Sequence, residues 1–167
     1  MKLHTITLGC QMSAADADEM SGPLKARGYR PTSELAEADA VLINTCTVRQ
    51  HAADRALSLI GTLRPWKEEN PQRLLIIAGC AAERLSSWLQ KRFPYIDLVV
   101  GAKSIESFPA ILAQALEERF DAPKENALAF SENAPDASPV VSFVTIMRGC
   151  NYSCSYCIVP AVRGREL

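Results

Sequence analysis

Six cysteines are the residues of this 167-residue chain whose type and spacing most clearly indicate chemistry. They form two sets of three: Cys10, Cys46 and Cys80, and then Cys150, Cys154 and Cys157. The sequence shows no signal peptide and no apolar run long enough to span a bilayer, so we expect a cytoplasmic protein, without a membrane partner, whose thiols stay reduced. There, six cysteines are expected to be ligands or catalysts rather than halves of disulfides.

The second set has the spacing C-x3-C-x2-C, which is compact and unusual. Zinc sites favour C-x2-C pairs with a fourth ligand, and ferredoxin clusters take a fourth cysteine. The sequence has no fourth cysteine near this set. The triad can therefore hold three irons of a four-iron cluster and leave the fourth iron open; an accidental triad or a partial zinc site is the alternative.

The first set is spread along the chain, but each of its members follows an expected strand and precedes an expected helix. Parallel strands that end in cysteine bring their thiols to the sheet edge where α/β proteins bind ligands. Gly9 and Gly79 would let the backbone approach a bulky ligand. A single buried cysteine is usually a small core residue, but three at equivalent strand ends indicate a shared iron–sulfur or zinc site.

The elements that position these cysteines alternate between strands and helices. Strands that are apolar on both faces, each followed by a helix, are typical of a parallel sheet covered on both sides. The sequence thus predicts a doubly wound α/β fold, flavodoxin-like or Rossmann-like, with Ser13 as a helix N-cap and Gly28 as a helix stop. The expected strands are 3–8, 40–44, 73–78 and 97–100, and the expected helices are 13–27, 49–63, 83–93 and 104–119.

The composition changes beyond the last expected helix. We expect a domain at 1–120 and a linker at 121–139, which is rich in Ala, Pro, Ser, Asn and acidic residues. One further strand is expected at 140–147, so that 140–167 would be the start of a second, truncated domain. The net charge of −1 gives no electrostatic reason for this piece to bind nucleic acid by itself.

Both cysteine sets together resemble the radical S-adenosylmethionine (SAM) methylthiotransferase family over essentially the whole chain. The spacing of the second set is similar to the cluster motif of radical SAM enzymes, and the last stretch resembles the branch that acts on tRNA. The chain departs from the family at Ser13, where asparagine is common. The matching stretches are 7–12, 44–49, 79–81 and 148–166.

This resemblance implies an enzyme that inserts a methylthio group at C2 of N(6)-isopentenyladenosine at position 37 of tRNA, beside the anticodon. It implies two [4Fe-4S] clusters, with Cys10, Cys46 and Cys80 holding an auxiliary cluster and Cys150, Cys154 and Cys157 the radical SAM cluster. S-adenosylmethionine would be the second cofactor. The implied partners are an electron donor such as flavodoxin or ferredoxin, and the tRNA anticodon stem-loop, bound mainly through regions beyond this piece, which alone should be inactive.

Other side chains are expected near these cofactors. Asn44 and Arg49 are candidates for the vicinity of the auxiliary cluster, and Arg148, Tyr156 and Arg163 for the vicinity of S-adenosylmethionine or the substrate. Alternative substrates are threonylcarbamoyladenosine in tRNA and an aspartate of a ribosomal protein. A further alternative is a flavodoxin-like or zinc-binding interaction module without catalytic activity.

Overall fold

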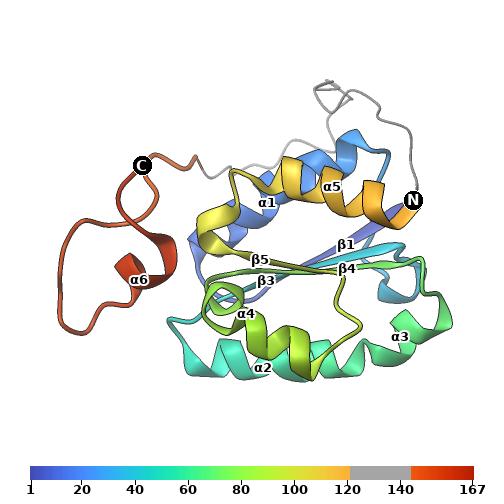
Figure 1. Cartoon of the computed structure of the whole chain (residues 1–167), viewed down its shortest axis with the longest axis horizontal. Coiled ribbons are helices and arrows are strands. Elements are labelled where there is room, and N and C mark those ends of the chain that lie inside the picture. The colour runs from blue at the N-terminus through green and yellow to red at the C-terminus, as the bar shows by residue number, and fades with distance from the viewer. Residues whose placement is uncertain (121–143) are drawn as a thin grey trace.

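The computed structural model describes residues 1–120 and 144–167. Its core is one five-stranded parallel sheet in the order β2-β1-β3-β4-β5 (Figure 1). The doubly wound α/β fold expected from the sequence is confirmed, and the two central strands are buried along their whole length. The strands are β1 (Lys2–Thr7), β2 (Arg30–Pro31), β3 (Ala40–Thr45), β4 (Leu74–Gly79) and β5 (Leu98–Gly101).

Helices cover both faces of the sheet. Figure 1 shows α1 (Gln11–Ala26) and α5 (Phe108–Phe120) on one face, and α2 (Gln50–Thr62), α3 (Arg64–Glu69) and α4 (Cys80–Arg92) on the other. Alternate residues of each central strand enter two separate hydrophobic clusters. Because strand side chains alternate between faces, an uninterrupted apolar strand supplies both cores at once.

The ends of several elements differ from the expectation. Helix α1 begins at Gln11 with Cys10 at its N-cap, so the prediction of Ser13 as N-cap is wrong; Ser13 lies buried inside the first turn. Gly28 follows the helix with φ of 86°, as a helix stop requires. Pro65 does not simply follow α2: it stands in the first turn of α3, where its missing N–H costs nothing.

The expected strand at 140–147 is not found in its described part. Residues 144–147 have no regular structure, and residues 140–143 and the expected linker 121–139 lie outside the described residues. A strand needs a hydrogen-bonded neighbour, and no strand that the structure describes pairs with this stretch. The apolar side chains of Val144 and Ile146, which suggested the strand, are exposed.

A short helix follows the second cysteine set. The sequence did not predict α6 (Val159–Arg163), which has Pro160 in its first turn. It contacts α4 and the 3-10 turn Ala102–Ser104, and its Val162 enters the core on the α1 and α5 face. No helix among the described residues combines the length and the apolar composition that crossing a membrane requires.

Candidate metal centre

The three N-terminal cysteines lie at the carboxyl edge of three adjacent strands. Cys10 follows β1, Cys46 follows β3 directly, and Cys80 is the first residue of α4 after β4. The strands are parallel and in matched register, with Thr7 opposite Asn44 and Thr45 opposite Gly79. The topology thus brings to one edge three thiols that are far apart in the sequence.

Glycines allow the chain to pack tightly around these thiols. Gly9 has φ of 145°, and a Cβ on it would lie 2.3 Å from Cβ of Cys46. Gly79 has φ of 96°, and its Cβ would lie 2.2 Å from Oδ1 of Asn44 and 2.4 Å from the carbonyl oxygen of Thr45. Only glycine tolerates both the backbone angle and the contact. The turn before α1 therefore lies directly against Cys46.

The three thiols have different surroundings. Cys10 is exposed, whereas Cys46 and Cys80 are buried. Burial acts to raise the pKa of the Cys10 thiol, but hydrogen bonds from Ser13 and Met12 outweigh it, so this pKa lies below its ordinary value. The hydroxyl oxygen of Ser13 lies 3.7 Å from the Cys10 sulfur. Cys10 thus has the electrostatic surroundings of a thiolate ligand at a helix N-terminus.

Cys80 is influenced mainly by its burial, which raises the pKa of its thiol despite a hydrogen bond from Arg163. Arg163 comes from α6 and also donates to Oδ2 of Asp16 at 2.6 Å. Burial acts to lower the pKa of this guanidinium, but Asp16 and Cys80 outweigh it and raise the pKa above its ordinary value. Arg163 is therefore a permanent positive charge beside the first cysteine set.

The donor chemistry fits an iron–sulfur cluster better than a single ion. The three candidate ligands at this edge of the sheet, Cys10, Cys46 and Cys80, are all thiols, and an iron–sulfur cluster binds each thiolate to a different iron. Among the described residues, no group of three Cys, His, Asp or Glu side chains is placed to hold one metal ion. The assignment of the first set to a cluster stays a prediction.

Asn44 lies near the carboxyl end of β3, and its place beside an auxiliary cluster stays a prediction. It is fully buried, and its Nδ2 donates to the carbonyl oxygen of Ser13 at 2.8 Å, which joins β3 to the first turn of α1. Its Oδ1 has no hydrogen-bond partner among the described residues. Arg49 is exposed and stands at the N-cap of α2.

The second cysteine set lies on residues 144–167, which are irregular apart from α6 and which we call the docking segment. Arg148 and Leu167, on either side of the cysteines, are tied by a pair of backbone hydrogen bonds of 3.2 and 3.0 Å, and the Cys150 N–H donates to the carbonyl oxygen of Gly164 at 3.1 Å. Cys154 and Cys157 are exposed, as is Tyr156. Cys150, whose backbone is tied to Gly164, is half-buried.

Asp16 is a residue of this region that the sequence analysis missed. It is fully buried and pairs with both Arg148 and Arg163. A signal was available: Asp16, Met20 and Leu24 recur at the four-residue spacing of one helix face, and all three are fully buried. A carboxylate on such a face requires a charged partner. That Arg148, Tyr156 and Arg163 lie near S-adenosylmethionine stays a prediction.

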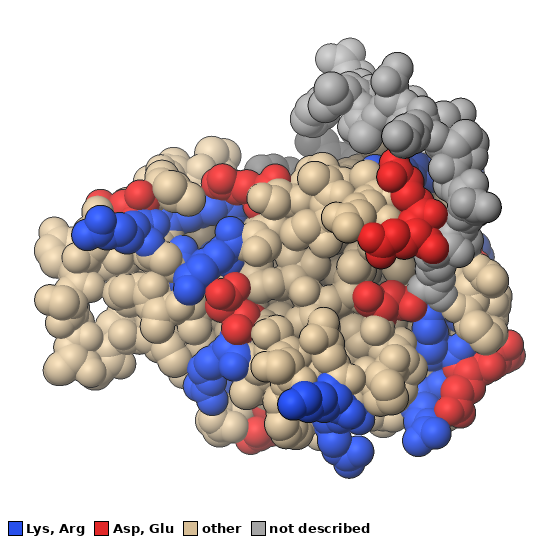
Figure 2. Space-filling model, viewed as in Figure 1, with Lys and Arg blue, Asp and Glu red and all other residues tan. Residues whose placement is uncertain are grey.

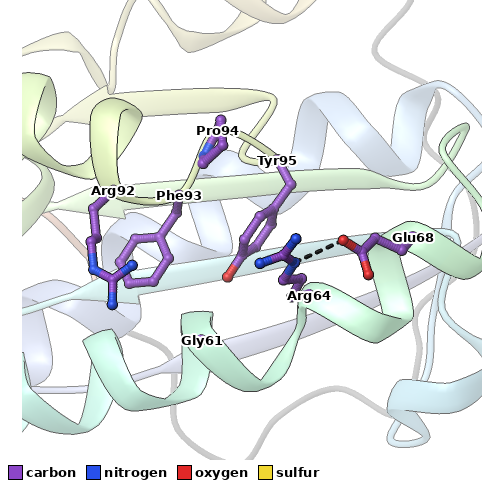
Figure 3. Close-up of a pocket in the computed structure, with 7 residues that line it drawn as sticks. All are labelled: Gly61, Arg64, Glu68, Arg92, Phe93, Pro94 and Tyr95. Carbon is purple, nitrogen blue, oxygen red and sulfur yellow. Dashed lines mark hydrogen bonds and ion pairs between the residues drawn. The ribbon is translucent and has the colours of Figure 1, made fainter.

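A separate hollow of about 480 Å³ is lined by residues of α2, α3 and α4 and of the loop after α4 (Figure 3). Figure 3 shows Arg64 paired with Glu68 beside Tyr95, and Arg92 over Phe93. None of the cysteines or other expected site residues lines it. Its lining residues are Gly61, Arg64, Glu68, Arg92, Phe93, Pro94 and Tyr95.

Comparisons with known proteins agree with the resemblance read from the motifs. Residues 2–101 match the model of a family described as "Uncharacterized protein family UPF0004". The chain is 41% identical over 98% of its length to a tRNA-2-methylthio-N(6)-dimethylallyladenosine synthase of Caldicellulosiruptor saccharolyticus, and equally so to one of Syntrophobacter fumaroxidans. A Sulfurihydrogenibium relative of the same name is 37% identical over 99% of the chain. The chain spans 36%, 37% and 39% of these relatives' lengths, respectively.

Proposed function

Since this chain belongs to the UPF0004 family, we propose that it works in a tRNA methylthiotransferase that converts N(6)-dimethylallyladenosine to its 2-methylthio form. The proposal is carried by the likeness to relatives of that name, which extends through both cysteine sets. The modified carbon would be C2 of the base at position 37. Such an enzyme would act in the cytoplasm on the tRNA anticodon stem-loop, with a small redox protein as electron donor.

We assign each cysteine set to its own [4Fe-4S] cluster. Cys10, Cys46 and Cys80 would hold the auxiliary cluster, and Cys150, Cys154 and Cys157 the cluster that binds S-adenosylmethionine. When bound, these groups would supply the sulfur to be inserted, the methyl group and the radical that activates the base carbon. With three thiolates for each cluster, one iron in each would stay open to a further ligand.

The chain's own residues would hold and shield these groups. Hydrogen bonds from Ser13 and Met12 lower the pKa of the Cys10 thiol, and the positive charge of Arg163 acts to lower that of Cys80. Positive charge beside thiolates offsets the accumulated negative charge of an all-thiolate site. Gly9 lets the turn before α1 approach Cys46 closely, and Gly79 lets the β4–α4 junction pack against Asn44 and Thr45.

Iron content tests the assignment of the cysteines. After anaerobic reconstitution with iron and sulfide, we expect about eight irons per chain, four for each cluster. The triple variant Cys10→Ala, Cys46→Ala, Cys80→Ala should keep about four, and so should the matched variant of the second set. About four irons in the unmutated chain would mean that one set is not a cluster site.

A chimera tests the function. Residues 1–167 would replace the equivalent part of the Caldicellulosiruptor relative, in a bacterial host that lacks its own enzyme. Mass spectrometry of digested tRNA should then detect 2-methylthio-N(6)-dimethylallyladenosine, and a chimera with Cys80→Ala should give none. The proposed substrate would be wrong if the chimera with intact cysteines left N(6)-dimethylallyladenosine unmodified, whether it modified threonylcarbamoyladenosine instead or neither nucleoside.

A further inference from the structure

We propose that Asp16 is a positioning residue that anchors the docking segment on the N-terminal domain and thereby holds the two cysteine sets in a fixed relation. The anchoring follows from the contacts of the chain itself, whereas its consequence for the two sets rests on the proposed function. Asp16 is a positioning residue and not a catalytic one, because it acts by holding two arginines.

One carboxylate holds both ends of the cysteine loop. Nη1 of Arg148 donates to Oδ1 of Asp16 at 2.8 Å, and Nη2 of Arg163 donates to Oδ2 at 2.6 Å. Arg148 stands just before Cys150, and Arg163 stands after Cys157 in α6. Each oxygen of Asp16 therefore takes an arginine from a different end of the same loop.

Burial makes Asp16 the main partner of these arginines. Arg148 also pairs with Glu19, and its Nε lies 3.6 Å from Glu106, but the side chains of Glu19 and Glu106 are 43% and 60% exposed. Exposed ion pairs contribute little, because water and salt screen them. Asp16 is 0% exposed, and a charge that is buried without its partner is strongly unfavourable. Loss of the Asp16 charge would therefore leave the nearly buried guanidinium of Arg148 with only the more exposed carboxylates of Glu19 and Glu106, and would remove the carboxylate that pairs with Arg163.

The anchor also reaches the first cysteine set. The guanidinium that Asp16 holds is also the one whose positive charge acts on the Cys80 thiol. Val162, beside Arg163 in the chain, belongs to the same buried apolar cluster as Phe108 and Leu112. The docking segment is thus fixed to the rest of the described chain by an apolar contact and by the Asp16 pairs.

Hydrogen exchange of the full chain without metal tests the anchor. In Asp16→Asn, we expect the amides of Arg148, Cys150, Gly164 and Leu167 to exchange at least about tenfold faster, because the segment detaches and its backbone bonds open. Amides of β3 and β4 should keep their protection. Asp18→Asn is the matched control, because it removes the same charge from an exposed position on the same helix. It should leave every amide unchanged.

Two further variants separate positioning from a general structural role. Arg163→Gln should also speed exchange in the docking segment, and the double variant should exchange little faster than Asp16→Asn alone, because Asp16→Asn already removes the Arg163 pair together with the Arg148 pair. Asp16→Glu should restore part of the protection. The proposal would be overturned if β3 and β4 lost as much protection as the docking segment. It would also be overturned if the effects of Asp16→Asn and Arg163→Gln on exchange were strictly additive, or if Asp16→Asn exchanged like Asp18→Asn. None of these outcomes depends on metal binding or methylthiolation, so they are independent of the proposed function.

Discussion

The first three cysteines occupy equivalent places in the sheet, yet their thiols differ chemically. Cys10 is exposed at the N-cap position of α1, where hydrogen bonds from Ser13 and Met12 act on its thiol, whereas Cys80 is buried as the first residue of α4. Hydrogen bonds favour the thiolate and burial disfavours it. The pKa of Cys10 is therefore lowered and that of Cys80 raised, although Arg163 acts to lower both.

This difference predicts the pH dependence of alkylation in the protein without metal. The thiolate is the form that reacts with the alkylating reagent. The alkylation rate of Cys10 in the folded protein should therefore reach half its maximum at a lower pH than that of Cys10 in the urea-unfolded protein. For Cys80, the half-maximal rate should come at a higher pH in the folded protein than in urea. Ser13→Ala should move the Cys10 midpoint upward, since the hydroxyl no longer donates to the sulfur. Peptide mass spectrometry measures each site. A Cys10 profile equal to that in urea would contradict the prediction.

For single residues, the sequence was enough to predict the two cysteine sets but not all of the residues that surround them in the fold. The cysteine sets were recognisable because spacing and strand ends are local patterns. Asp16 was not, because its arginines stand 132 and 147 residues away, and only the folded chain brings them together. The buried helix face could have marked Asp16 as a residue that needs a charged partner, but not which arginine it would take.

The junction between β4 and α4 shows how an element positions a thiol. Gly79 ends the strand with a positive φ, so that Cys80 becomes the first residue of the helix. Thr45, at the end of the neighbouring strand, accepts the N–H of Ala82 with its hydroxyl oxygen at 3.2 Å and donates the same hydroxyl to the carbonyl of Ala78 at 2.6 Å. The junction is thereby held on both sides.

Gly79→Ala should destabilise this junction. The added Cβ would meet Asn44 and the Thr45 backbone, and alanine disfavours the positive φ, so we expect a loss of about 2–4 kcal/mol in the free energy of unfolding. Gly61→Ala is the control, because Gly61 lies in α2 with open space around it. It should gain up to about 1 kcal/mol. Urea unfolding followed by circular dichroism measures both, and equal values for the two variants would refute the account.

Helices and strands could be predicted from the sequence where neighbouring residues alone determine them. Apolar runs and helix stops located four strands and four helices, because one strand–helix unit is specified by its own residues. The two-residue β2 and the single-turn α6 carry too few residues for a periodic pattern. The strand expected at 140–147 depended on a neighbour that no described strand supplies, so its apolar pattern alone could not decide the outcome.

At the scale of the whole molecule, positive and negative charges nearly balance in number. The net charge is −1, and Figure 2 shows acidic and basic side chains interspersed over the visible face. Several arginines near the cysteines are already engaged: Arg148 and Arg163 with Asp16, and Arg84 with the hydroxyl of Thr47 at 3.1 Å. Phosphate binding depends on cations that are free to replace counterions. This part of the protein therefore offers little general attraction for RNA.

We therefore expect residues 1–167 to bind an anticodon stem-loop weakly, with a Kd of about 10⁻⁵ M or higher at physiological salt, in the range of non-specific binding. Fluorescence anisotropy with a labelled stem-loop measures this Kd, and the chimera with the relative's remaining residues is the matched comparison. The chimera should bind at least about tenfold more tightly, because those residues would add the phosphate contacts that this piece lacks. Submicromolar binding by residues 1–167 would place the main RNA surface on this domain, contrary to its charge distribution.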